Sequence, residues 1–187
     1  MKKISVYLGS SPYCLEKYND VAYSIGCEIA RHGYTLIYGG AAVGTMGRLA
    51  DGAQEHGGEV IGVFPKGFCG TREVRESGIS VVREGLNQMI EVADFAQRKQ
   101  VMEDLSDCAI VLPGSFGTMD ELFTYACNRA IEKHSKNVYV LNVDGFYDPL
   151  KALLENMKQG VFLKQTMIGV ISFYDTVEEL FQAIESH

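Results

Sequence analysis

The chain alternates between short apolar runs and longer segments whose apolar residues recur every three or four positions. The short runs are rich in β-branched residues, which is typical of buried strands, whereas the longer segments have the spacing of amphipathic helices. This alternation predicts an α/β fold in which parallel strands are joined by crossover helices. We expect strands over residues 3–8, 35–38, 59–64, 108–112, 137–142 and 168–173. We expect helices over residues 16–32, 45–56, 87–105, 118–133, 147–159 and 176–186.

Glycines and chain length define the organisation further. His32-Gly33 and His56-Gly57-Gly58 follow amphipathic segments and are expected to end helices, because glycine readily adopts the left-handed conformation found there. The least regular stretch, residues 65–86, is interpreted either as a mobile flap or as an ordinary surface loop. With 187 residues, 47% of them hydrophobic, the chain is expected to form a single domain over residues 1–187.

The balance of charges limits the classes of ligand. Lys and Arg number 17 and Asp and Glu 24, which gives a formal net charge of -7. A broad basic surface for nucleic acid or for an acidic membrane is therefore not expected, and any anionic ligand has to be held locally. The apolar stretch after Met1-Lys2-Lys3 is too short for an export signal, and no run approaches membrane-spanning length.

The cysteines and histidines offer little chemistry by their spacing. The five cysteines are odd in number and contain no Cys-x-x-Cys pair, which favours reduced thiols in a cytoplasm. The histidines show no metal-ligand spacing and the aspartates do not cluster as in a calcium site, so we expect no metal and no other cofactor. These residues are Cys14, Cys27, Cys69, Cys108 and Cys127, and His32, His56, His134 and His187.

Three loops that follow predicted strands are candidates for a binding site. In an open parallel sheet the ligand lies beyond the carboxyl ends of the strands, where the connections reverse direction. The loops at this edge are rich in glycine or hydroxyl side chains and lead towards helices. They are Gly9-Ser10-Ser11, Gly39 to Gly47 and Pro113 to Thr118.

The segment from Pro113 to Glu121 offers the clearest chemistry. A glycine-lined turn at a helix start presents free backbone N–H groups and the positive end of the helix dipole, so Gly114 to Thr118 can bind a phosphate without a lysine. Gly117 lets the backbone approach an anion closely, and Thr118 adds a hydroxyl. The structural alternative is that Thr118-x-x-Glu121 forms a capping box, in which both side chains satisfy the helix's own donors. Spacing alone favours the cap.

The loop from Tyr38 to Gly47 is also rich in glycine. Its glycine spacing is that of a nucleoside triphosphate loop, but Thr45 stands where that loop needs lysine, so a triphosphatase is not expected. The Gly-x-Gly-x-x-Gly fingerprint of dinucleotide-binding proteins is missing too, which argues against an oxidoreductase. The glycines are explained either by a tight strand-to-helix turn or by ligand binding.

Arg98 and Lys99 lie within the predicted helix 87–105. Charged residues of this kind usually form a solvated helical face. The functional alternative is that Arg98 leans over the loop mouth and pairs with a phosphate or with charge developing on a substrate. The apolar positions expected to pack against the sheet are Ile90, Ala93, Val101 and Leu105.

Four motifs follow one another along the chain, and each would be weak alone. They are Tyr38-Gly39-Gly40-x-x-x-Gly44-x-Met46-Gly47, Gln97-Arg98-Lys99, Pro113-Gly114-x-x-Gly117-Thr118-x-x-Glu121 and Leu141-Asn142-Val143-Asp144-Gly145-Phe146-Tyr147. In this order and with these separations they resemble the Lonely Guy family over nearly the whole chain. Members of that family are phosphoribohydrolases that release a free base and ribose 5-phosphate, and are best known for activating cytokinin nucleotides.

The resemblance implies a fold, an assembly and a set of site residues. It implies a Rossmann-like fold with helices on both faces of the sheet, a homodimer with the active site near the interface, and Arg98 and Glu121 as the catalytic pair. Some relatives carry the label of lysine decarboxylase, but no lysine is identifiable as the Schiff-base partner that pyridoxal chemistry requires. The residues expected to hold the 5′-phosphate or to lie close to the substrate are Gly114, Gly117, Thr118, Lys99, Thr45, Ser10, Gly44, Ser115, Phe116 and Asp120.

The sequence departs from the family pattern at three places. Ser115 replaces the second glycine of the usual Pro-Gly-Gly triplet, which restricts the backbone but adds a hydroxyl donor. The Trp-x-Gln-Leu-Gly stretch common in the following helix reads Asn128-Arg129-Ala130-Ile131-Glu132 here, and residues 68–84 lack a clean match. The last two differences concern the surroundings of the base.

Together these features predict hydrolysis of the N-glycosidic bond of a nucleoside 5′-monophosphate, either AMP or its N6-prenylated form. Bond breaking builds positive charge on the ribose, so the Glu121 carboxylate is expected beside the anomeric carbon. Arg98 would steady the phosphate or the departing base. The alternatives are a nucleotide-binding or cofactor-carrier module of related fold and a DNA-handling protein, which would need a basic groove that the charge does not indicate.

Overall fold

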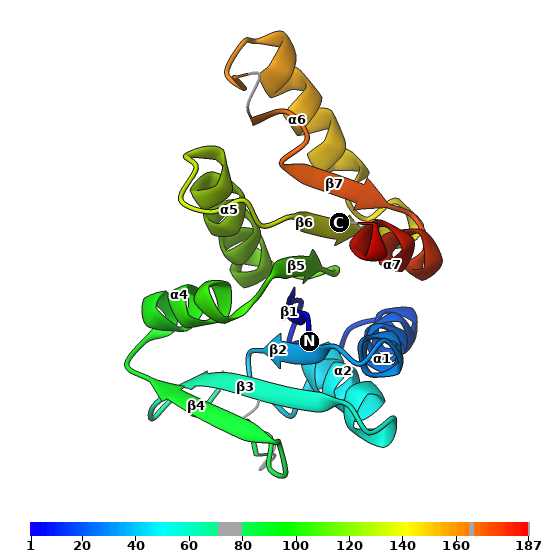
Figure 1. Ribbon diagram of the computed structural model, residues 1–187, viewed down its shortest axis with the longest axis vertical. Coiled ribbons are helices and arrows are strands. Elements are labelled where there is room, and N and C mark those ends of the chain that lie inside the picture. Colours follow the sequence, from blue (N-terminus) through cyan, green and yellow to red (C-terminus); the bar gives the residue numbers. More distant parts are fainter. Residues whose placement is uncertain (71–79, 165–166, 187) are drawn as a thin grey trace.

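The computed structural model describes residues 1–70, 80–164 and 167–186. Its centre is a seven-stranded sheet of order β4-β3-β2-β1-β5-β6-β7, and all neighbouring strands run parallel (Figure 1). The strands are β1 (Lys3–Tyr7), β2 (Thr35–Tyr38), β3 (Glu59–Pro65), β4 (Gln88–Val92), β5 (Cys108–Val111), β6 (Val138–Leu141) and β7 (Ile171–Tyr174). The helices are α1 (Glu16–Arg31), α2 (Gly44–Glu55), α4 (Phe95–Leu105), α5 (Phe116–Ala130), the 3-10 turn η1 (Val143–Gly145), α6 (Asp148–Gln159) and α7 (Val177–Glu185). The α/β prediction is confirmed.

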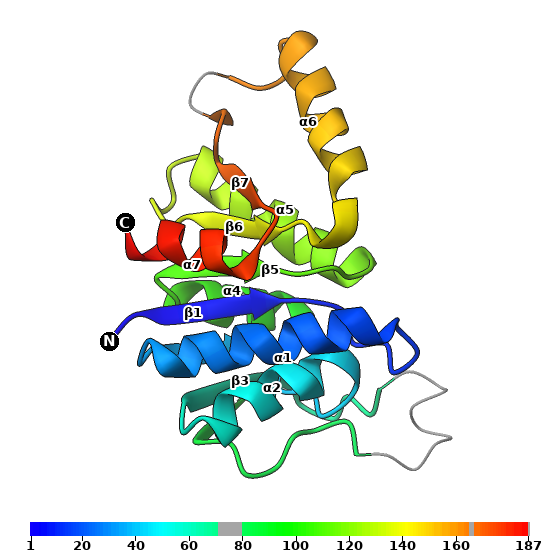
Figure 2. The ribbon, with the colours of Figure 1, turned by 90° about the vertical axis from the view of Figure 1, so that its right-hand side faces the viewer.

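Helices cover both faces of the sheet and create two cores. Helices α1, α2 and α7 lie on one face and α4 and α5 on the other (Figures 1 and 2). Successive residues of a strand point to opposite faces, so Ile4 and Val6 of β1 pack into the first core whereas Tyr7 packs into the second. The strands are therefore buried on both sides, which explains why they read as continuous apolar runs in the sequence.

Strand β1 lies at the point where the chain changes direction across the sheet. It pairs with β2 on one side and with β5 on the other. The connection after β1 leads through α1 to β2, whereas β5 is reached only after the chain has passed through β3, β4 and α4. The loops that leave the carboxyl ends of β1, β2 and β5 therefore meet at a topological switch point, which is where open α/β sheets bind ligands.

The predicted helix 87–105 is wrong in its first half. Gln88–Val92 is the edge strand β4, which pairs with β3 from Ile61 to Pro65. Helix α4 begins only at Phe95, because Asp94 caps it by accepting a hydrogen bond from the backbone N of Gln97 at 2.8 Å. Ile90, which was expected on the helix, consequently lies in the strand.

Other element boundaries lie closer to the expected ones. Gly33 and Gly57 have φ angles of +66° and +73° directly after α1 and α2, which confirms both predicted helix ends. Helix α5 begins at Phe116 rather than at residue 118, and β7 begins at Ile171 rather than at residue 168.

Helix α6 differs from the other helices because it stands at one end of the molecule. Figure 2 shows it projecting beyond the sheet, and none of its 12 residues is buried. Apolar residues such as Leu153, which is 45% exposed, therefore remain accessible on it. Within the described ranges, no helix is both long and apolar enough to cross a membrane.

Candidate active site

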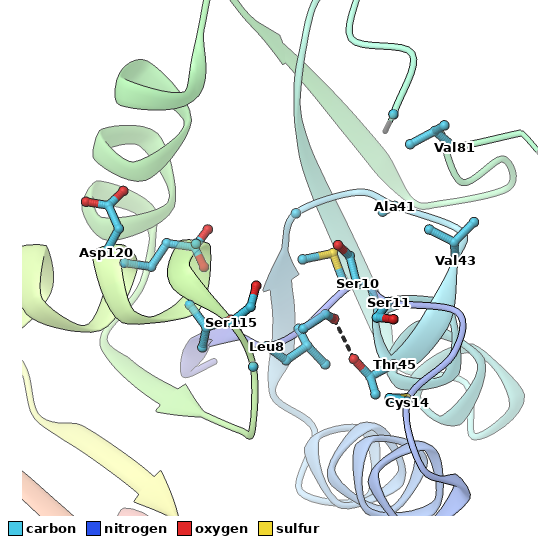
Figure 3. A pocket seen from close by; sticks show the side chains of 18 of the residues that line it. Leu8, Ser10, Ser11, Cys14, Ala41, Val43, Thr45, Val81, Ser115 and Asp120 are labelled. Carbon is cyan, nitrogen blue, oxygen red and sulfur yellow. Dashed lines mark hydrogen bonds between the residues drawn. The ribbon is translucent and has the colours of Figure 1, made fainter. Parts of the chain in front are cut away.

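A cavity of about 690 Å³ opens at the switch point, at the carboxyl ends of β1, β2 and β5. The three loops singled out in the sequence all contribute to its lining. In Figure 3, Ser10, Ser11 and Thr45 lie on one side of it and Ser115 and Asp120 on the other. The loop prediction is therefore consistent with the place where the structure forms its cavity.

The turn from Pro113 into α5 has the geometry of an anion cradle. A Cβ atom on Gly114 would overlap the Thr118 hydroxyl and would lie 2.8 Å from the backbone N of Gly9, so only glycine fits there. Ser115 is the N-cap residue, but its side chain makes no capping hydrogen bond. The first turn of α5 therefore presents its N–H groups towards the cavity with no side-chain cap from Ser115.

The capping-box interpretation of Thr118 and Glu121 is wrong. Helix α5 begins at Phe116, which places Thr118 in the third helical position instead of at the cap. Both side chains are buried, and the Glu121 carboxylate is turned towards α4. Neither side chain therefore caps the helix.

Arg98 and Glu121 form a buried ion pair at the edge of the cavity. The distance from Arg98 Nη1 to Glu121 Oε1 is 3.3 Å, and the two residues are only 8% and 6% exposed. The interpretation of Arg98 as part of a solvated face is therefore wrong. Arg98 and Met102 are four positions apart on α4, so they share one face of the helix, and both are buried. Within the described ranges, Arg98 Nε has no hydrogen-bond partner.

The surroundings of Glu121 tune its ionisation. Burial raises the pKa of this carboxyl to about 7, the Arg98 guanidinium opposes the shift, and the neighbouring Asp120 carboxylate adds to it. A carboxyl group with a pKa close to neutrality can accept or release a proton near neutral pH. Perturbed carboxyl groups of this kind in a cavity are typical of active sites.

The glycine-rich loop after β2 lies in close contact with two neighbours. One is the Arg98 side chain and the other is the loop after β1. A Cβ atom on Gly39 would overlap Arg98 Nη2, and a Cβ on Gly44 would overlap the carbonyl oxygen of Ser11. Gly44 also has a φ angle of +57°. The Thr45 hydroxyl donates to the carbonyl oxygen of Gly9 at 2.5 Å, the contact dashed in Figure 3. The tight-turn explanation therefore accounts for Gly44, whereas Gly39 makes room for the Arg98 side chain.

The remaining predicted site residues divide into two groups. Lys99 lines the cavity, and its Nζ donates to Asp120 Oδ2 at 2.7 Å and to Thr124 Oγ1 at 3.2 Å. Phe116 does not line the cavity, since its side chain is 93% exposed at the start of α5. Gly44 also lies outside the lining. The predicted residues that the cavity brings together are Ser10, Thr45, Arg98, Lys99, Gly114, Ser115, Gly117, Thr118, Asp120 and Glu121.

An aromatic wall is one part of the cavity that the sequence did not predict. Phe64, Phe68 and Phe95 form it, with ring centroids 5.8 Å apart for Phe64–Phe68 and 5.0 Å for Phe68–Phe95. The Arg98 guanidinium lies 5.8 Å from the centroid of Phe95. Phe64 and Phe68 surround the carboxyl end of β3, so the rule that selected the other loops would also have selected them.

The end of the irregular stretch borders the same cavity. Residues 71–79 lie outside the described residues, so the flap and surface-loop interpretations of the whole stretch stay predictions. Val81 lines the cavity, and its carbonyl oxygen accepts a hydrogen bond from Ala42 N at 2.8 Å. Arg83 Nη1 lies 2.7 Å from Asp51 Oδ1 on α2. This part of the stretch is thus held against the loop after β2.

The fold and the cavity together define a Rossmann-like α/β protein with a buried acid–base pair beside a helix N-terminus. A family model described as "Possible lysine decarboxylase" matches residues 46–184. The chain is 36% identical over 186 residues to the cytokinin riboside 5′-monophosphate phosphoribohydrolase of Rhodococcoides fascians, with 99% of this chain and 90% of that protein covered. It is 31% identical over 186 residues to cytokinin riboside 5′-monophosphate phosphoribohydrolase LOG5 of Arabidopsis thaliana, covering 100% and 78%. The chain belongs to this family, that of the Lonely Guy (LOG) proteins.

Solved structures with the same fold include proteins of another kind. The molybdenum cofactor carrier protein from Chlamydomonas reinhardtii has a TM-score of 0.71 at 21% identity, covering 99% of this chain and 96% of that one. The molybdenum cofactor binding protein from Rippkaea orientalis has a TM-score of 0.70 at 24% identity, with the same coverage. At these identities the likeness concerns the fold alone.

The description of the family model raises the question of pyridoxal phosphate, the cofactor of most amino-acid decarboxylases. A lysine that could form a Schiff base would have to stand free in the cavity. Among the described lining residues, the lysine is Lys99, which is held by Asp120 and Thr124. The residues present therefore do not fit this cofactor.

Proposed function

We propose that the protein hydrolyses the N-glycosidic bond of a nucleoside 5′-monophosphate, either AMP or its N6-prenylated form. The products would be the free base and ribose 5-phosphate. The observation that carries this proposal is the buried Arg98–Glu121 pair, which shares one cavity with the uncapped glycine-rich start of α5. An anion site and a tuned carboxylate side by side are what the cleavage of a phosphorylated nucleoside requires.

The phosphate would bind at the first turn of α5. The backbone N–H groups from Gly114 to Thr118 and the helix dipole supply the attraction, and the Ser115 hydroxyl is available as a further donor because it makes no capping bond. Lys99 lies close by and adds positive charge. Fixing the phosphate orients the sugar, so binding energy from the non-reacting end supports the chemical step.

Glu121 would act at the anomeric carbon. As the bond between C1′ and the base nitrogen breaks, positive charge develops on the ribose, and a carboxylate placed nearby stabilises it more in the transition state than in the ground state. Water then forms the new C1′–O bond and gives one proton to the carboxylate, and the carboxyl group passes that proton to the departing base nitrogen, which regenerates the ionised Glu121. A pKa of about 7 allows Glu121 to take up and release this proton near neutrality.

Arg98 would have two tasks in this reaction. Its Nη1 atom opposes the effect of burial on Glu121 and so keeps part of the carboxyl ionised at neutral pH. Its Nε donor has no partner within the described residues, so it is available to the phosphate or to the departing base.

The base would lie against the aromatic wall of Phe64, Phe68 and Phe95. Aromatic rings offer flat apolar contact to any nucleobase, and so they do not select one base by hydrogen bonding. A cavity of about 690 Å³ also leaves room for a substituent on the base. The R. fascians and A. thaliana relatives are named for cytokinin riboside 5′-monophosphate, which supports the prenylated nucleotide as a substrate.

A substrate panel tests the proposal. The protein is incubated with AMP, isopentenyl-AMP and the other nucleoside 5′-monophosphates, and free base and ribose 5-phosphate are quantified. Release of base from at least one of them, lost in Glu121→Gln, is the expected result. Tight binding with no release from any nucleotide would overturn the enzyme proposal in favour of a carrier, and full turnover by a folded Glu121→Gln variant would overturn the assigned role of the carboxylate.

We also propose that two copies of the chain pair through the outer faces of α5, α6 and β7 in the cytoplasm. An apolar groove of about 470 Å³ lies between these elements, with Phe123, Leu154 and Phe173 in its lining. Helix α6 has no buried residue although one of its faces is apolar, so covering it would remove apolar surface from water. A second copy offers the same apolar groove, as a two-fold interface requires.

A further inference from the structure

The motif from Leu141 to Tyr147 lies beside the cavity, yet none of its residues takes part in the proposed reaction. It connects β6 to α6 through the turn η1. Its backbone includes Asp144 and Gly145, with φ angles of +49° and +75°. Glycine adopts such a conformation freely and aspartate tolerates it, so the chain can turn sharply here. The contacts that hold this segment lead directly to the phosphate cradle.

Asn142 fixes the segment at its start. Its Nδ2 donates to Asp148 Oδ1 at 3.0 Å and to Asp175 Oδ1 at 3.1 Å, and its Oδ1 accepts from the backbone N of Tyr147 at 2.7 Å. The two carboxylates accept only, so the amide nitrogen has to face them and the amide oxygen has to face Tyr147. The buried Asn142 side chain therefore sets the backbone position of Tyr147.

Tyr147 connects this segment to the carboxyl end of β5. Its ring is buried, and its hydroxyl donates to the carbonyl oxygen of Leu112 at 2.7 Å. The ladder between β5 and β6 ends at the pair Val111–Val140. Leu112 lies one residue beyond this pair, and the Tyr147 hydroxyl satisfies its carbonyl oxygen where the strand ends.

Leu112 directly precedes the phosphate cradle, which has little freedom of its own. Pro113 O accepts from Gly9 N at 3.2 Å, and Gly114 is packed so closely against Thr118 that it leaves no space for a Cβ atom. A shift of the Leu112 carbonyl would therefore move the N–H groups that face the phosphate. Small misplacements of binding groups are costly in a preorganised site.

We propose that Tyr147, held by Asn142, is a positioning residue for the phosphate cradle. It touches no part of the substrate and acts by fixing the Leu112 carbonyl, and with it the backbone at Gly114. The inference rests on the proposed function insofar as the cradle is taken to hold a phosphate. The positioning role differs from a purely structural role in its effect on binding. Loss of the Tyr147 hydroxyl should weaken phosphate binding and leave the base side of the cavity unaffected.

The test is Tyr147→Phe, which removes only the hydroxyl. Dissociation constants for ribose 5-phosphate, inorganic phosphate and adenine are measured by calorimetry, with kcat and KM for AMP. We expect affinity for both phosphate compounds to fall by roughly 2- to 12-fold, the worth of one hydrogen bond, and adenine affinity to stay unchanged. The control is Tyr139→Phe, because Tyr139 is also a buried tyrosine but its hydroxyl accepts from Asn137, at 3.1 Å, and does not touch the cradle.

Hydrogen exchange keeps the test independent of catalysis. We expect the amides of residues 112 and 114–118 of Tyr147→Phe to exchange faster than in the wild type, with the rest of the sheet unchanged. A uniform rise in exchange, an equal loss of adenine affinity, or unchanged exchange and phosphate affinity would each overturn the inference. If the wild type binds ribose 5-phosphate but cleaves no nucleotide, the proposed function fails while the binding and exchange results still decide on Tyr147.

Discussion

The Arg98 side chain crosses the main chain of Gly39 so closely that a Cβ atom on Gly39 would overlap Nη2 of the guanidinium. Gly39 follows β2 directly, whereas Arg98 comes from α4, so the end of a strand and a helix meet at this contact. Arg98 Nη1 lies 3.3 Å from Glu121 on the far side. The space that glycine leaves at residue 39 therefore determines where the cation lies relative to the carboxylate.

Gly39→Ala should displace the Arg98 side chain and lower activity. Removing one preorganised charged contact costs on the order of 100-fold in turnover, and we expect Arg98→Ala to reach this loss. Gly39→Ala should approach the same value, because the methyl group and the guanidinium cannot share one position. The measurement is kcat/KM for AMP, with the melting temperature as a check on folding.

A double variant shows whether the effect passes through Arg98. In the Arg98→Ala background there is no guanidinium to displace, so adding Gly39→Ala should cost little more. If the two losses simply multiply, residue 39 acts by another route and the contact described above has no bearing on activity.

Gly117→Ala separates ligand binding from helix formation. Gly117 is the second residue of α5, and a Cβ atom there would have nothing within 4 Å. Alanine is the better helix former, so the free energy of unfolding should be retained or rise by about 0.5–1 kcal/mol. A methyl group at the helix start would nevertheless keep the phosphate from the backbone N–H groups. Losing one charge-assisted hydrogen bond, about 1.5–3 kcal/mol, corresponds to a drop of at least about 10-fold in ribose 5-phosphate affinity.

Urea unfolding and calorimetry on the same Gly117→Ala preparation provide both numbers. Unchanged affinity for ribose 5-phosphate would mean that the phosphate binds elsewhere in the cavity, and a large loss of stability would mean that the open space at residue 117 is filled in solution.

The fold was largely predictable because most strands are buried on both faces. Such strands read as short, mainly apolar runs, as with Cys108–Val111, where no polar residue interrupts the run. Strand β4 escaped because it lies at the sheet edge, mixes polar with apolar residues and runs into α4 without a glycine or proline. Asp94-x-x-Gln97 carried the missing signal, because it has the spacing of a capping box: Asp94 caps Gln97 N, and Gln97 Oε1 accepts from Ala93 N, one residue before the cap, at 2.6 Å.

The site was predictable in its residues but not in their burial. Spacing alone placed Arg98 on a solvent-exposed helical face and Glu121 in a helix cap. Both assignments depended on where α4 and α5 begin. An error of two residues at Phe116 is enough to change a capping position into an inward-facing one. The carboxyl end of β3 points to Phe64 and Phe68 of the aromatic wall, but their contact with Phe95 of α4 is long-range packing, which leaves no pattern in a local stretch of sequence.

The raised pKa of Glu121 makes stability depend on pH. The carboxyl has a pKa of about 7 in the folded protein and an ordinary value of 4.5, so the native state binds more protons than the unfolded state between these values. Stability should therefore fall as the pH rises from about 4.5 to 7, by up to about 3 kcal/mol. Glu121→Gln lacks this slope. Urea unfolding at several pH values should show the free energy of unfolding of the variant rising relative to that of the wild type over this interval. Parallel curves would contradict the raised pKa of Glu121.

The pH dependence of activity should reflect the ionisation of the same carboxyl group. If the ionised carboxylate of Glu121 supports cleavage, kcat/KM for AMP should rise with pH and level off above about 7. Asp120→Asn should move the midpoint to lower pH, because the Asp120 carboxylate contributes to the raised pKa of Glu121. A midpoint that does not respond to Asp120→Asn would assign the titration to another group.

Phe123→Asp should separate the proposed dimer. Phe123 lines the groove between α5, α6 and β7 and is already 38% exposed, so a charge there should cost the monomer little. In a dimer the same side chain would be covered, and central aromatic residues of interfaces typically contribute about 2 kcal/mol or more, which corresponds to at least about a 30-fold rise in the dimer dissociation constant. Sedimentation velocity over a concentration series measures this constant. Leu15→Asp is the matched control, because Leu15 is 63% exposed and does not line the groove. A wild-type chain that stays monomeric throughout the series, or a Phe123→Asp variant that dimerises like the wild type, would contradict pairing through this face.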